Sequence, residues 1–162
     1  MTFLSMIPVA GFCGCSLVAA LSDARTLRIS NSLSLAILAL FGTYAAATLT
    51  LAMTATALGL ATVALVVGFA AFSRGWLGGG DAKLFAVCMA WAGLPHAAEF
   101  LAVTGIAGGI VALALRAPLT APIAGRVRRD WPGSPSEQRA SMPYGVAIAA
   151  GALAVAAELL AQ

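Results

Sequence analysis

Charge is what this chain has least of. Only 9% of its 162 residues are Asp, Glu, Lys or Arg, and 61% are hydrophobic, whereas an ordinary soluble domain carries about 25% charged residues. No charged residue lies between Arg28 and Arg74, and a helix needs about 20 consecutive apolar residues to cross a bilayer. The shortage of charge therefore excludes an ordinary soluble domain and predicts a polytopic membrane protein.

The residues that several enzyme classes need are also missing. The chain has one histidine, His96, and it has neither an H-E-x-x-H zinc motif nor a G-x-S-x-G nucleophile motif. Its three cysteines, Cys13, Cys15 and Cys88, lie in apolar runs without a C-x-x-C pair, where free cysteine usually behaves as a small hydrophobe. These absences argue against zinc, serine and thiol chemistry, and we expect no metal and no cofactor.

Long apolar runs predict about six membrane-spanning helices. Because lipid offers no water to the backbone, each run is expected to be helical, so the fold class is an all-α bundle that forms a single domain over residues 1–162. A connection of about residues 116–142, rich in Pro, Ser, Gly and Arg, is expected to be a cytoplasmic loop. The predicted helices lie near residues 3–22, 32–50, 53–73, 80–95, 97–115 and 143–160.

The basic residues predict the orientation of the bundle, because Lys and Arg concentrate in cytoplasmic loops. We expect both termini outside the cytoplasm, and the connections after the first, third and fifth helices inside it. This orientation accounts for the net charge of +3, and the basic residues can also attract the anionic lipid of the bilayer. The charge gives no reason to expect nucleic acid binding. All nine basic residues fall in those three alternate connections: Arg25, Arg28, Arg74, Lys83, Arg116, Arg126, Arg128, Arg129 and Arg139.

Two of the six acidic residues, Asp23 and Asp81, need a functional explanation. Asp23 ends the first predicted helix and Asp81 begins the fourth, so both belong at the cytoplasmic end of the bundle. Alone, Asp81 could cap a helix N-terminus, and Asp23 could pair with Arg25 or Arg28. Together, two neighbouring carboxylates can share a proton, so that one activates a water molecule and the other protonates a carbonyl oxygen. This pair predicts aspartyl hydrolase chemistry.

Three short motifs resemble those of the type IV prepilin peptidases, and in particular the short Flp/Tad-type enzymes. The segment "DARTLRISN", residues 23–31, is similar to the family pattern D-x-R-x-x-x-I-P-N, with Ser30 where proline is common. The segment "GGGDAKL", residues 78–84, contains the G-x-G-D pattern, and its glycines leave room for an extended substrate. "MPYG", residues 142–145, opens the last predicted helix. The resemblance covers essentially the whole chain.

The resemblance implies an inner-membrane aspartyl endopeptidase that removes the basic leader peptide of prepilins or pseudopilins at the cytoplasmic face. It implies Asp23 and Asp81 as the catalytic pair, and as partners a prepilin substrate, the lipid bilayer and the pilus assembly machinery. Larger relatives have an added region with paired cysteines that N-methylates the product; this chain has neither the cysteines nor the length, so we expect cleavage without methylation. Residues of the same motifs would shape the site or position the substrate: Arg25, Asn31, Gly78, Gly80, Lys83, Pro143, Tyr144 and Gly145.

Three other functions stay open on the sequence alone. A presenilin-like or signal-peptide-peptidase-like protease also carries G-x-G-D, although "LSDARTL" is a poor match to the Y-D motif of those proteins. A small transporter or channel subunit could use Asp23 and Asp81 to bind a proton or a cation, although such acids belong more naturally near the bilayer midplane. A non-catalytic scaffold for pilus assembly is the third alternative.

Overall fold

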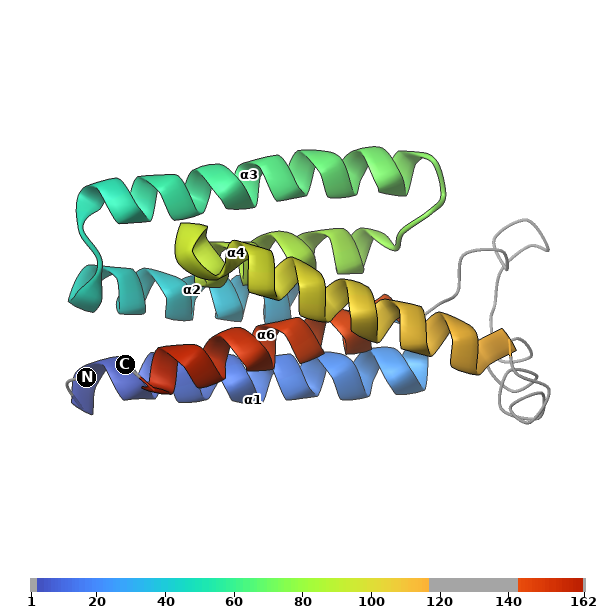
Figure 1. Ribbon diagram of the computed structural model, residues 1–162, viewed down its shortest axis with the longest axis horizontal. Helices are drawn as coiled ribbons and strands as arrows, with labels where there is room; N and C mark the ends of the chain where they lie inside the picture. The colour runs from blue at the N-terminus through green and yellow to red at the C-terminus, as the bar shows by residue number, and fades with distance from the viewer. Residues whose placement is uncertain (1–2, 117–142, 162) are drawn as a thin grey trace.

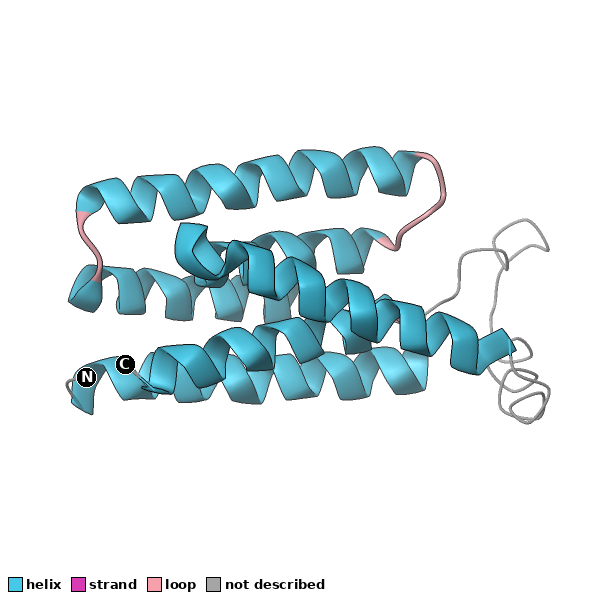
Figure 2. Ribbon diagram, in the orientation of Figure 1, coloured by secondary structure: helices cyan, strands magenta, loops and turns pink. Residues whose placement is uncertain are grey.

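The structure is a computed structural model that describes residues 3–116 and 143–161. All regular structure in these two ranges is helical (Figure 1, Figure 2), and each of the five helices is long and apolar enough to cross a membrane. The predicted all-α membrane bundle is therefore confirmed, while the predicted loop lies outside the described residues except for its first residue, Arg116. The helices are α1 (Phe3–Thr26), α2 (Asn31–Thr48), α3 (Leu51–Ser73), α4 (Gly79–Arg116) and α6 (Tyr144–Ala161).

Helix α4 contains two of the predicted spans. Its backbone leaves helical geometry at Gly93, where φ is 54° and ψ is −165°, a conformation that residues with a side chain rarely adopt. Pro95 follows, and proline cannot donate a helical hydrogen bond. The chain reverses direction here (Figure 1), so the two halves of α4 run antiparallel. The expected spans 80–95 and 97–115 both exist, and the connection between them is reduced to a kink.

Side-chain caps fix the starts of α2 and α3. The hydroxyl of Ser30 accepts a hydrogen bond from the Ser32 N–H group at 3.3 Å, and the hydroxyl of Thr50 accepts one from the Met53 N–H group at 3.3 Å. Each cap satisfies a donor that the first turn of a helix would leave unpaired. The first three helices therefore follow one another through short connections and alternate in direction.

An aromatic cluster around Trp91 joins α1, α2 and the first half of α4. The Trp91 ring stacks on Phe12 at a centroid distance of 4.4 Å and on Tyr44 at 5.2 Å, and it meets the edge of Phe41 at 5.9 Å. The indole N–H group donates to the Ile37 carbonyl at 3.1 Å, so its polar atom is satisfied although the side chain is buried. This cluster holds three helices in one register.

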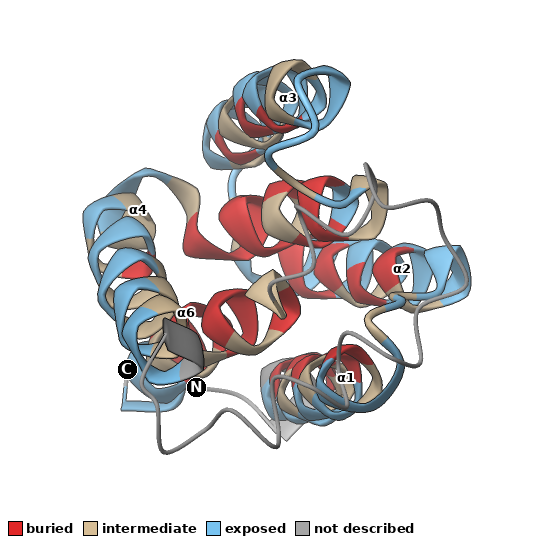
Figure 3. Cartoon of the chain, turned by 90° about the vertical axis from the view of Figure 1, so that its right-hand side faces the viewer, coloured by how far each residue is buried: buried red, intermediate tan, exposed pale blue. Residues whose placement is uncertain are grey.

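Helix α6 lies inside the bundle and α3 lies at its edge (Figure 3). Half of the most apolar window of α6 is buried, against 17% for α3. Two glycine contacts set the register of α6 on the second half of α4: Gly151 faces Phe100 and Thr104, and Ala147 faces Gly108. The two helices therefore run antiparallel, and this brings the start of α6 to the end of the bundle where α1 ends and α4 begins.

Replacing Gly93 by alanine tests the kink. An L-residue at this φ and ψ is strained, which costs about 1–3 kcal/mol, so we expect Gly93→Ala to lower the temperature of thermal unfolding in detergent. The matched control is Gly59→Ala in the middle of α3, where an added Cβ meets nothing within 4 Å. Because alanine is the better helix former, this control should unfold at the wild-type temperature or above it. Equal unfolding temperatures for Gly93→Ala and wild type would contradict the kink.

Candidate active site

Asp23 lies in the last turn of α1 and is 3% exposed. Its Oδ2 atom accepts a hydrogen bond of 2.7 Å from the backbone N–H group of Gly145, in the first turn of α6. The first N–H groups of a helix have no partner within the helix, and the helix dipole favours a negative charge beside them. Among the described residues no ion pair joins Asp23 to Arg25 or Arg28. Asp23 is thus held by the end of another helix.

Gly145 can sit this close to Asp23 only because it has no side chain. A Cβ atom added at Gly145 would lie 2.8 Å from Asp23 Oδ2, 2.9 Å from Asp23 Cβ and 2.8 Å from Ile29 Cδ1. All three separations are shorter than ordinary contacts between such atoms. The close packing against α1 therefore explains why the "MPYG" segment has glycine at position 145.

Asp81 lies in the first turn of α4 and is 8% exposed. Its Oδ2 atom faces Gly78, where an added Cβ would lie only 2.7 Å away. Its Oδ1 atom is buried and has no hydrogen-bond partner among the described residues. Buried polar atoms without partners are rare, and each one carries a desolvation cost. This oxygen is therefore available to bond a water molecule or a substrate group.

The structure brings Asp23 and Asp81 to the same end of the bundle, which we call the aspartate end. They are brought together through one residue of the connection between α1 and α2. Ile29, in the connection between α1 and α2, contacts both halves of the site: its backbone oxygen lies 3.2 Å from a Cβ built on Gly80, and its side chain faces Gly145. A single half-buried isoleucine thus separates the two aspartate-bearing segments.

Other predicted residues lie around this pair without contacting it. The Lys83 Nζ atom donates a hydrogen bond of 2.9 Å to Asn31 Oδ1, which joins α4 to α2, and no ion pair connects Lys83 to Asp81 among the described residues. Lys83 follows Asp81 by two positions, about 200° around the helix, so the two side chains point to different faces. Arg25 is exposed in the last turn of α1.

Pro143 and Tyr144 are half-buried at the start of α6. The Pro143 carbonyl accepts a hydrogen bond from the Val146 N–H group at 3.3 Å, so the segment forms the first turn of the helix that holds Asp23. Pro143 and Tyr144 therefore directly precede Gly145 in this turn. No contact of either side chain with the aspartates is observed in the described part of the chain.

Ile29 and Ser30 contribute to the site although neither was among the predicted site residues. The D-x-R-x-x-x-I pattern could have pointed to Ile29, because the pattern includes an isoleucine at this position. The structure explains that isoleucine by its contacts with Gly80 and Gly145. Ser30 stands where proline is common in that pattern, and it caps α2 through its hydroxyl. Serine in place of the usual proline therefore still allows α2 to begin at Asn31.

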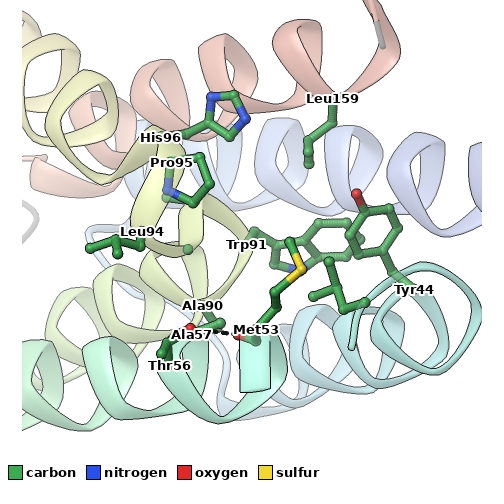
Figure 4. A pocket seen from close by; sticks show the side chains of 13 residues that line it. Tyr44, Met53, Thr56, Ala57, Ala90, Trp91, Leu94, Pro95, His96 and Leu159 are labelled. Carbon is green, nitrogen blue, oxygen red and sulfur yellow. Dashed lines mark hydrogen bonds between the residues drawn. The ribbon is translucent and has the colours of Figure 1, made fainter. Parts of the chain in front are cut away.

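A pocket of about 320 Å³ lies at the opposite end of the bundle (Figure 4). Trp91 and Tyr44 line it together with Met53 and the kink at Gly93. None of the described residues that line it is acidic, and it lies toward the ends of α2 and α6 that are remote from Asp23 and Asp81. This pocket is therefore separate from the candidate active site.

The sequence model of the type IV leader peptidase family matches residues 10–113. The matched range contains both aspartates and the glycines before Asp81, while Gly145 and the rest of α6 lie beyond it. No match was found among curated proteins or among solved structures. The family match confirms the resemblance that the sequence motifs indicated.

A double-mutant cycle tests the contact between α1 and α6. Gly145→Ala places a methyl group against Asp23 and disturbs a charge-assisted hydrogen bond of about 1.5–3 kcal/mol, so it should destabilise the wild-type protein. In an Asp23→Ala background the carboxylate is absent, and Gly145→Ala should cost less, with a coupling energy of about 0.5–3 kcal/mol. Thermal unfolding of the four proteins measures the coupling. Additive effects would contradict this contact.

Proposed function

The chain belongs to the type IV leader peptidase family, and we propose that it is a membrane aspartyl endopeptidase with Asp23 and Asp81 as its catalytic pair. One observation carries the proposal: two buried carboxyl groups, delivered by α1 and α4, lie on either side of Ile29 at one end of a membrane bundle, and the Oδ1 atom of Asp81 has no hydrogen-bond partner among the described residues. Family membership accounts for a peptidase, and the carboxyl pair accounts for its chemistry.

The pair carries out hydrolysis by general acid–base catalysis. The ionised carboxylate takes a proton from a water molecule as the water oxygen attacks the carbonyl carbon of the scissile peptide bond. The protonated partner gives its proton to the carbonyl oxygen, which yields a neutral tetrahedral intermediate. The carbon–nitrogen bond then breaks, the leaving nitrogen gains a proton from the first carboxyl group, and the second regains its own from a hydroxyl of the intermediate. The pair ends in its starting protonation state.

The proposed substrate is a prepilin or pseudopilin of the Flp type, cleaved behind its basic leader. Both aspartates lie at the end of the bundle where Arg25, Arg28 and Arg74 are found, whereas the connection between α2 and α3 holds no basic residue. Because basic connections face the cytoplasm, this supports cleavage at the cytoplasmic face of the inner membrane, with both termini on the other side. The three cysteines lie within α1 and α4, and the proposed activity is cleavage without N-methylation.

The depth of the aspartates favours proteolysis over transport. A proton or cation carrier holds its binding acids near the bilayer midplane, whereas Asp23 is in the last turn of α1 and Asp81 in the first turn of α4. At a helix end water can reach the carboxyl groups, and hydrolysis consumes water. An inert scaffold would gain nothing from a buried carboxyl oxygen without a partner, because that oxygen only lowers stability.

Conservative substitution of each aspartate tests the proposal. Asparagine keeps the shape of the side chain but can neither accept nor release the proton, so Asp23→Asn and Asp81→Asn should each lower the rate of leader removal by roughly 10²–10⁴-fold. Co-expression with a Flp-type prepilin and separation of the precursor from the mature form on a gel measures the effect.

Glu158→Gln is the matched control. This acid is exposed near the C-terminal end of α6, remote from the aspartate end, so removal of its charge should leave processing at the wild-type level. Processing at that level by both aspartate variants would show that the two carboxyl groups do not carry out the reaction.

A further inference from the structure

Helices α2 and α3 follow one another in the chain, yet a groove separates them. Each packs against the first half of α4, and neither packs substantially on the other, so α3 stands apart at the edge of the bundle (Figure 3). Two hollows of about 430 Å³ and 520 Å³ lie along α2 and meet at Leu38. Because both hollows share Leu38, we call them together the α2–α3 groove.

One face of α2 and one face of α3 line the groove, and near the aspartate end α4 also contributes Lys83, Ala86 and Val87. On α2 the lining positions recur every three or four residues from Asn31 to Leu49, and on α3 Leu51, Leu58 and Leu65 face them at intervals of two helical turns. Helix α2 has 18 residues, or about 27 Å at 1.5 Å per residue, close to the thickness of about 30 Å of a bilayer core. The groove therefore has the length of one transmembrane helix.

The wall of α2 also has the shape that helix packing in lipid requires. Gly42, Ala45 and Ala46 line its middle and far part, and an added Cβ at Gly42 meets nothing within 4 Å. Small residues let a second backbone approach closely in a membrane. A helix is therefore a better fit to this wall than disordered acyl chains, which need no small residues beside them.

The charged and amide groups of the groove lie at the aspartate end, whereas the one polar residue described in the lining of the other half, Thr54, donates its hydroxyl to the Thr50 carbonyl. The Lys83–Asn31 hydrogen bond crosses the mouth of the groove at the aspartate end. Ser34 lines the groove one turn further in, 6% exposed, with an Oγ atom that has no partner among the described residues. Ile29 and Asp81, which belong to the candidate site, precede Asn31 and Lys83 by two positions each.

We propose that the α2–α3 groove seats the transmembrane helix of the substrate that Asp23 and Asp81 cleave; this rests on the proposed function. A bond can be cut only where the helix is unwound, and unwinding exposes backbone N–H and C=O groups that lipid cannot satisfy. Lys83 can donate to a freed carbonyl, and Asn31 and Ser34 can accept from freed N–H groups. These three residues therefore stabilise the point where the substrate changes from helix to extended chain.

Site-specific photo-crosslinking tests the occupant. A photoreactive amino acid is placed at Leu38 or Leu58 in the groove, and at Ile106 or Leu113 on the second half of α4, which are 65% and 70% exposed but outside it. The protein carries Asp81→Asn to slow turnover and is co-expressed with a Flp-type prepilin that retains its transmembrane helix. We expect prepilin adducts at Leu38 and Leu58 and none at the two control positions. Adducts only with lipid or with a second copy of the chain, or equal prepilin adducts at all four positions, would overturn the proposal.

A blocking substitution gives an independent measure. Gly42→Phe fills the groove and should lower prepilin processing by at least 10-fold, while Gly59→Phe, on a face of α3 that does not line the groove, should process at the wild-type rate. Equal processing by the two variants would contradict docking in the groove. A wild-type protein that forms the groove adducts but leaves the leader uncut would instead contradict the proposed peptidase, because adduct formation requires no cleavage.

Discussion

The hydrogen bond from the Gly145 N–H group to Asp23 is the contact on which the geometry of the site depends. It joins the last helix to the first, so α6 must be in place before Asp23 has its orientation. The same N–H group would otherwise be an unpaired donor at a buried helix start. This one contact therefore both stabilises the bundle and orients the carboxyl group. It requires glycine at position 145, because a side chain there would collide with Asp23.

The two aspartates have different surroundings, and this difference suits acid–base chemistry. Asp23 has a backbone donor at the start of α6, which stabilises a negative charge, while the Oδ1 atom of Asp81 is buried and has no donor in the described part of the chain. Both lie at helix ends, where the chain can admit water and an extended peptide. The apolar length of the bundle remains available for holding a helix, so the chemistry and the proposed substrate seat occupy different parts of the same membrane structure.

The helices and the end of the bundle that carries the aspartates could be predicted from the sequence, because lipid restricts a spanning chain to apolar helices and because basic residues mark alternate connections. A short turn was expected where the chain reverses at Gly93. The kink itself could not be predicted, because an apolar run does not show that a glycine in it has a φ of 54°. The contact between Gly145 and Asp23 joins residues 122 positions apart, and no local pattern contains it. The pairing of Lys83 with Asn31 and the groove between α2 and α3 likewise follow from helix packing, which spacing along the chain does not determine.

A structure of the full chain with a substrate peptide bound is the most direct test of the aspartyl pair. The peptide should carry a hydroxyethylene group in place of the scissile bond. This group has no amide bond to cleave, and its hydroxyl takes the place of a hydroxyl of the tetrahedral intermediate. The account predicts that this hydroxyl lies within about 2.5–3.0 Å of a carboxyl oxygen of both Asp23 and Asp81. A bound peptide whose hydroxyl contacts neither aspartate, with the two carboxyl groups too far apart to share it, would contradict the account.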